Sequence, residues 1–92
     1  MAYKILIIDD DKDILTIISD MLSGYGYEVT TATSAEDAFD LLSKGSYHLL
    51  LLDINLPDSD GFEICKQLRE VSTVPVIFLI SLFLEYSLSS QE

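Results

Sequence analysis

The sequence predicts a single α/β domain built on a parallel β-sheet. Ninety-two residues suffice for one domain, and a hydrophobic content of 49% is enough to supply its core. Short apolar runs alternate with amphipathic segments along the whole chain, with short loops and no internal repeats. Alternation of this kind is typical of parallel strands joined by right-handed crossovers, with helices covering both faces of the sheet.

Four apolar runs are expected to form the strands. Residues 4–9 (KILIID) and 48–53 (HLLLLD) are apolar at consecutive positions and end in an acid, as expected of strands buried on both faces. Residues 27–32 (YEVTTA) are rich in β-favouring residues and alternate weakly. Residues 75–80 (PVIFLI) form the last run.

The segment between the first two runs, residues 11–26, has the spacing of an amphipathic helix. Gly24 marks its expected end, because glycine readily adopts the conformation that terminates helices. The apolar positions at helical spacing are Ile14, Leu15, Ile17, Ile18, Met21 and Leu22.

Two further segments predict helices. Residues 34–45 begin with Ser34 as a capping residue, have Asp37 as its capping partner, and close on Gly45. Residues 61–71 form the third predicted helix. Its apolar side is expected to carry Phe62, Cys65 and Leu68.

Composition excludes several classes of function. With 16 acidic and 5 basic side chains the net charge is -11, which argues against binding to nucleic acid or to an anionic membrane surface. Cys65 is the only cysteine, so no internal disulfide or cysteine metal site can form, consistent with a cytoplasmic location. The N-terminal apolar run is too short for a signal peptide. The apolar window at residues 74–86 is too short to span a membrane and includes Pro75 and Glu85.

Aspartates follow two of the predicted strands. Asp9 and Asp10 come after the first strand, and Asp53 ends the third. In open parallel sheets, ligands bind beyond the carboxyl ends of the strands, where the strand order reverses. If these two strands are neighbours, the three carboxylates converge. Acids after a strand also cap helices, and Asp11 suits that role.

Crowded carboxylates repel one another, so a cluster of this kind favours a bound cation. Oxygen ligands with an open coordination shell suit Mg²⁺. A hard divalent ion beside an aspartate is also an arrangement for phosphoryl transfer, in which the carboxylate attacks phosphorus and becomes an acyl phosphate. The acidic residues therefore predict Mg²⁺ as a cofactor.

The two acidic stretches resemble a known family. ILIIDDD (residues 5–11) and LLLLDINLPDSDGFEIC (residues 49–65) resemble the receiver domain of two-component response regulators, and the resemblance extends over residues 4–79. It implies a flavodoxin-like, doubly wound parallel sheet of order 2-1-3-4-5. Here the order is expected to be 2-1-3-4, because the family's fifth strand and last helix have no counterpart in this sequence.

The resemblance also implies roles for individual residues. Asp53 is then the phosphoacceptor, and two residues shape the adjoining loop, Pro57 and Gly61. The implied ligands of Mg²⁺ are Asp9, Asp10, Asp53 and the backbone carbonyl of Asn55.

The sequence departs from the family pattern after the fourth strand. Ile80 occupies the position of the family's switch Thr or Ser, and Ser81 is one residue late, which places it on the opposite face of a strand. No Lys or Arg follows Arg69, so the phosphate-pairing Lys is absent. We expect residues 1–80 to form a receiver domain without its C-terminal third, with impaired phosphorylation, and residues 81–92 to be an apolar tail used in self-association.

The expected partners are a sensor histidine kinase or phosphotransfer protein and a second copy of the chain, joined through strand four and the tail at residues 81–92. We expect no enzymatic activity. An alternative function is a non-signalling receiver relic that acts as a dimerising interaction module. A haloacid-dehalogenase-like phosphatase is disfavoured, because Asn55 stands where that family has a second Asp as general acid.

Overall fold

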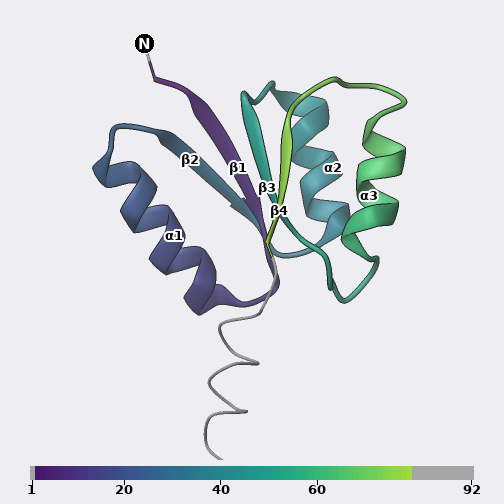
Figure 1. Ribbon diagram of the computed structural model, residues 1–92, viewed down its shortest axis with the longest axis horizontal. Helices are drawn as coiled ribbons and strands as arrows, with labels where there is room; N and C mark the ends of the chain where they lie inside the picture. Colours follow the sequence, from purple (N-terminus) through teal and green to yellow (C-terminus); the bar gives the residue numbers. More distant parts are fainter. Residues whose placement is uncertain (1, 80–92) are drawn as a thin grey trace, which may run out of the picture.

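The computed structural model describes residues 2–79, which form seven alternating strands and helices. The strands lie close to the apolar runs of the sequence, and each of the first three is followed by a loop and a helix (Figure 1). The elements are β1 (Lys4–Ile8), α1 (Lys12–Gly24), β2 (Glu28–Ala32), α2 (Ala35–Lys44), β3 (Leu49–Asp53), α3 (Gly61–Leu68) and β4 (Val76–Leu79).

The strands form one parallel sheet of order β2-β1-β3-β4. Helix α1 lies on one face, and α2 and α3 lie together on the other (Figure 1). The doubly wound, flavodoxin-like arrangement predicted from the sequence is thus confirmed. Ile80 and the predicted tail at residues 81–92 lie outside the described residues. Within residues 2–79, no helix has the length and apolar character that crossing a membrane requires.

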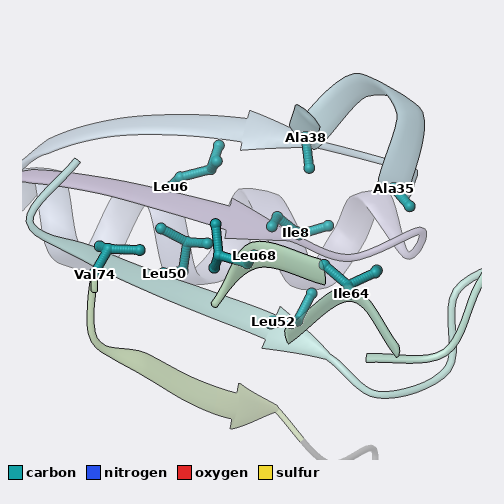
Figure 2. Close-up of a cluster of buried hydrophobic side chains, with 10 residues drawn as sticks. Leu6, Ile8, Ala35, Ala38, Leu50, Leu52, Ile64, Leu68 and Val74 are labelled. Carbon is teal, nitrogen blue, oxygen red and sulfur yellow. The ribbon is translucent and has the colours of Figure 1, made fainter. Parts of the chain in front are cut away.

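The larger part of the core lies between the sheet and the pair α2 and α3. Alternate residues of the two central strands point to this face, where they meet small residues of α2 and branched residues of α3 (Figure 2). The buried residues of this cluster are Leu6, Ile8, Ala32, Ala35, Ala38, Leu50, Leu52, Ile64, Leu68 and Val74.

The opposite face has a smaller cluster, because α1 contributes a single buried residue, Leu15. Leu15 packs with residues of β1 and β3 that alternate with those of the first face, namely Ile5, Ile7 and Leu51. Two apolar residues of the predicted helical pattern, Ile17 and Met21, are instead 62% and 55% exposed on the outer side of α1.

The apolar side of α3 differs from the sequence prediction. Phe62 is 63% exposed, and the residues that face the core are Gly61, Ile64 and Leu68. The phase of the helix is set by its first residue, which packs against the backbone at the end of β3. The Phe62 ring reaches only the edge of the sheet, where its centroid lies 5.0 Å from that of Phe78.

Polar side chains cap the helices that the sequence predicted. Asp11 accepts hydrogen bonds from backbone N–H groups in the first turn of α1, and Ser34 accepts one from the N–H of Asp37 in α2. The predicted reciprocal contact from Asp37 is replaced by another. Its carboxylate accepts a hydrogen bond from the Thr33 hydroxyl at 3.3 Å.

Removing a side chain from the larger core should cost far more stability than removing the same side chain from the outer surface. Ile64 is 1% exposed in α3, and Ile17 is 62% exposed in α1. We expect Ile64→Ala to lower the free energy of unfolding by about 2–5 kcal/mol. The matched Ile17→Ala should change it by less than about 0.5 kcal/mol. Urea denaturation followed by circular dichroism measures both, and equal losses would contradict this assignment of the core.

Candidate acidic site at the carboxyl edge of the sheet

The register of the central strands places the aspartates side by side. Ile8 of β1 pairs with Leu52 of β3, so the residues that follow them, Asp9 and Asp53, leave the sheet at the same edge. Together with Asp10, each of them offers one carboxylate oxygen, and these three oxygens lie within 4.8 Å of one another. Asp9 and Asp53 are each only 3% exposed, whereas Asp10 is exposed.

Backbone contacts separate the roles of the three consecutive acids. The N–H of Asp9 donates to the Ala32 carbonyl at 3.0 Å, which holds this residue in line with β1 and β2. The Asp9 carboxylate accepts a hydrogen bond from the N–H of Asp11 at 2.9 Å. The Asp11 side chain turns away to cap α1. The side chains of Asp9 and Asp10 therefore belong to the acidic cluster, whereas the side chain of Asp11 caps α1.

The Asp9 carboxyl group has a raised pKa, so its ionised form is disfavoured within the cluster. Burial is the main cause that raises its pKa, from 3.8 to about 6. The hydrogen bond from Asp11 opposes this rise, and the neighbouring carboxyl groups of Asp53 and Asp10 add to it. A bound cation would relieve both the burial and the repulsion, because it stabilises the ionised form.

The donor set fits a hard divalent ion. All three side chains offer oxygen atoms, which Mg²⁺ prefers to nitrogen and sulfur. The exposed side of the cluster at Asp10 leaves room for water ligands, which Mg²⁺ usually retains. Asn55, whose backbone carbonyl is an implied ligand, follows closely in the next loop, and its N–H donates to the Asp53 carboxylate at 3.2 Å.

The loop after β3 is a short hairpin, residues 54–60. Asn55 and Asp60 form an antiparallel bridge, flanked by hydrogen bonds from the N–H of Leu56 to the Ser59 carbonyl and from the N–H of Gly61 to the Ile54 carbonyl. This leaves Pro57 and Asp58 at the tip of the hairpin. A proline there has no N–H to leave unpaired and fixes its own φ angle.

Gly61 is positioned where a side chain does not fit. A Cβ atom at this position would lie 2.7 Å from the Ile54 Cα and 2.8 Å from the carbonyl oxygen of Asp53. The first turn of α3 therefore packs directly against the backbone of the aspartate that the sequence singles out as phosphoacceptor. The position requires glycine for its small size.

Sequence reasoning missed the roles of two residues in this hairpin. Asp60 caps α3 by accepting from the N–H of Glu63 at 2.8 Å, which the Asp-x-x-Glu spacing could have indicated. Asp58 accepts hydrogen bonds from two N–H groups at the start of α2. No local sequence signal indicates that contact, because its partners are more than twenty residues away in the chain.

His48 lies far from the acidic cluster, at the opposite end of β3. Its Nδ1 accepts a hydrogen bond from the N–H of Lys4 at 2.8 Å, and its ring meets that of Tyr3 edge-on. An apolar groove of about 590 Å³ opens beside it, lined in part by Leu22 and Tyr27. None of the described residues that line this groove is an aspartate.

A parallel sheet of order β2-β1-β3-β4 with clustered aspartates after its two central strands is the arrangement expected of the family that the sequence resembles. Comparison with known families agrees: residues 5–85 match the model of the response regulator receiver domain. The chain belongs to this family. It is therefore a receiver domain of the two-component response regulator type, and the alternatives of an unrelated phosphatase or a separate interaction module are not favoured.

Known relatives support the assignment. The uncharacterized transcriptional regulatory protein YrkP of Bacillus subtilis (strain 168) is 40% identical over 79 residues, which cover 86% of this chain and 34% of that protein. The probable transcriptional regulator ycf27 of Porphyra purpurea is also 40% identical over 79 residues, covering 86% of this chain and 32% of that protein. The chain thus spans about a third of the length of these curated relatives.

Solved structures share the fold. A two-component response regulator from Clostridium difficile matches with a TM-score of 0.81 and 37% identity, covering 83% of this chain and 63% of that chain. The response regulator TrrA from Thermotoga maritima matches with a TM-score of 0.80 and 31% identity, covering 86% of this chain and 70% of that chain. The TrrA structure is of a complex with Mg²⁺-BeF.

Substitution of Gly61 should disturb the acidic edge. Gly61→Ala forces the hairpin or α3 to move, because the added methyl group meets rigid backbone. We expect the free energy of unfolding to fall by about 1–3 kcal/mol. The control is Gly24→Ala at the end of α1, where nothing lies within 4 Å, and stability should be unchanged or slightly raised. Chemical denaturation measures both, and similar behaviour of the two variants would rule out the close contact at Gly61.

The raised pKa of Asp9 predicts a pH dependence of the metal-free protein. Between its ordinary pKa of 3.8 and the folded-state pKa of about 6, the folded state holds a proton that the unfolded state has lost, so acidification favours folding. Lowering the pH from 7.5 to 5 should therefore stabilise the protein by about 1.4 kcal/mol through this group.

The measurement is urea unfolding at both pH values in the presence of a chelator, for the wild type and Asp9→Asn. The difference between the two proteins isolates Asp9 from the other acids. An identical change of stability with pH in both proteins would show that the pKa of Asp9 is not raised in the folded state.

Proposed function

We propose that this receiver domain accepts a phosphoryl group on Asp53 in a reaction that requires Mg²⁺. The observation that carries the proposal is the cluster of carboxylates at the carboxyl edge of the sheet, where two of the three members are buried. Burial of adjacent carboxylates costs stability. Their presence at this edge therefore favours a bound cation there.

Each residue has a definite task in this proposal. Asp9 and Asp10 hold the cation together with Asp53 and the backbone carbonyl of Asn55. A carboxylate oxygen of Asp53 attacks the phosphorus of the donor, and the bond between phosphorus and the donor's leaving group breaks. The hydrogen bond from the Asn55 N–H orients the Asp53 carboxylate for this attack.

Mg²⁺, when bound, neutralises the charge that develops on the phosphoryl oxygens. The chain's own contribution is positioning. Strand β3 presents Asp53 at its end, and the close packing of Gly61 fixes the backbone directly behind it. The Pro57 turn completes the loop. We propose a sensor histidine kinase or a phosphotransfer protein as the physiological donor.

Labelling by a small phosphoryl donor tests the proposal. Incubation with acetyl phosphate and Mg²⁺ should add the mass of one phosphoryl group, with release of acetate, at the reduced rate expected of the impaired phosphorylation that the sequence predicts, and a chelator should prevent it. We expect Asp53→Asn to abolish labelling, because an amide is a poor nucleophile. The control Asp20→Asn, at an exposed position of α1, should label like the wild type. Intact-mass spectrometry gives the result, and persistent labelling of Asp53→Asn would refute the assignment.

We also propose that the chain forms a homodimer through strand four and residues 81–92. Among the described strands, β4 pairs only with β3, so within residues 2–79 its outer edge has no strand partner, and such an edge is suited to pairing with a second chain. Ile77 in β4 is 54% exposed. The part of this proposal that concerns residues 81–92 lies outside the described structure.

The mass in solution tests the dimer. Sedimentation at micromolar concentration should give twice the monomer mass for the wild type. Ile77→Lys should reduce that mass, since a charged residue on an edge strand disfavours pairing with another strand. Ile17→Lys, at a comparably exposed position of α1, should leave the mass unchanged. A wild-type monomer would show that the β4 edge does not mediate association.

A further inference from the structure

The first turn of α2 is capped from outside the helix. Asp58, at the tip of the hairpin after β3, accepts hydrogen bonds from the N–H of Ala35 at 3.0 Å and from the N–H of Glu36 at 3.1 Å, one on each carboxylate oxygen. Ser34 accepts the next N–H, that of Asp37, at 3.2 Å. The N–H of Ala38 donates to the Ser34 carbonyl. Every backbone N–H in the first turn of α2 therefore has an acceptor.

The other two described helices are capped locally. Asp11 precedes α1 by one residue and Asp60 precedes α3 by one residue, and each caps the helix that follows it. Asp58 instead links α2 to a loop that is distant in the sequence. The hydrogen bonds from α2, that from Ala35 foremost, lower the pKa of the Asp58 carboxyl group below its ordinary value.

The same hairpin carries the residue that contacts the phosphoacceptor. At its base, the N–H of Asn55 donates to the Asp53 carboxylate, and the N–H of Gly61 donates to the Ile54 carbonyl at 2.8 Å. At its tip, Asp58 is tied to α2. Because the Asn55–Asp60 bridge makes the hairpin a single unit, holding the tip restricts the orientation of the base.

We propose that Asp58 is a positioning residue, which fixes the hairpin so that Asn55 is held against the Asp53 carboxylate. In treating Asp53 as the acceptor and the Asn55 carbonyl as a metal ligand, this rests on the proposed function. Asp58 acts through the hairpin and α2, and it touches neither the phosphoryl group nor the metal. Groups that orient the ligands of a metal commonly change its affinity, although they do not bind it.

Amide hydrogen exchange of the metal-free protein, followed by NMR, tests this role without relying on activity. Asp58→Ala should accelerate exchange at the Asn55 and Gly61 amides on the order of tenfold, because the hairpin is released at its tip. The matched control is Ser34→Ala, which removes a cap from the same helix end but leaves the hairpin tied. It should accelerate exchange at the Asp37 amide and leave the exchange rates of the Asn55 and Gly61 amides unchanged.

Asp58→Asn keeps one acceptor oxygen and should give an intermediate acceleration, and it decides the question if Asp58→Ala does not fold. Unchanged exchange at Asn55 in the Asp58 variants, or equal acceleration in Ser34→Ala, would overturn the proposal.

A Mg²⁺ titration separates this inference from the proposed function. Asp58→Ala should raise the Mg²⁺ dissociation constant on the order of tenfold, with Ser34→Ala within about twofold of the wild type. An unchanged constant in Asp58→Ala counts against the positioning role. A wild type that does not bind Mg²⁺ overturns the proposed function, while the exchange measurement still decides whether Asp58 holds the hairpin.

Discussion

The parallel pairing of β1 with β3 is the constraint on which the acidic edge depends. Both strands are apolar on both faces, and the pairing of Ile8 with Leu52 brings Asp9 and Asp53 out at the same level. A shift of one residue would turn each buried side chain of one strand toward the opposite layer of helices. The hydrophobic core therefore sets the distance between the carboxylates, and no direct attraction between them is needed.

The acidic edge is costly by itself and is supported by its surroundings. The raised pKa of Asp9 shows that its ionised form is disfavoured where it lies. Hydrogen bonds from the backbone at Asp11 and Asn55 to the Asp9 and Asp53 carboxylates offset part of this cost. The hydrophobic clusters on the two faces of the sheet offset the rest of this cost. The fold can tolerate a carboxylate whose ionised form is disfavoured because that carboxylate lies next to the most deeply buried strands.

Much of this architecture could be predicted from sequence. The alternation of apolar runs and helical periods gave the element order, because each signal depends on residues close together in the chain. The resemblance carried by the two acidic stretches gave the strand order. The orientation of α3 could not be predicted, since the contact of Gly61 with the backbone at Asp53 sets its phase and moves Phe62 to the surface. Long-range contacts of this kind leave no local periodicity. The hydrogen bonds from α2 to Asp58 could not be predicted for the same reason.

The unequal burial on the two faces of the sheet has a consequence for native-state fluctuations. Among residues 2–79, α2 and α3 place several residues in the larger core, whereas Leu15 is the one buried residue of α1. Because fewer of its residues are buried than in α2 or α3, we expect partial opening of the folded protein to begin at α1. The turn that starts α1 also contains the N–H bonded to Asp9. An opening that displaces the start of α1 would therefore break the hydrogen bond to the Asp9 carboxylate, the buried acid with the raised pKa, so fluctuations of this helix act directly on the acidic edge.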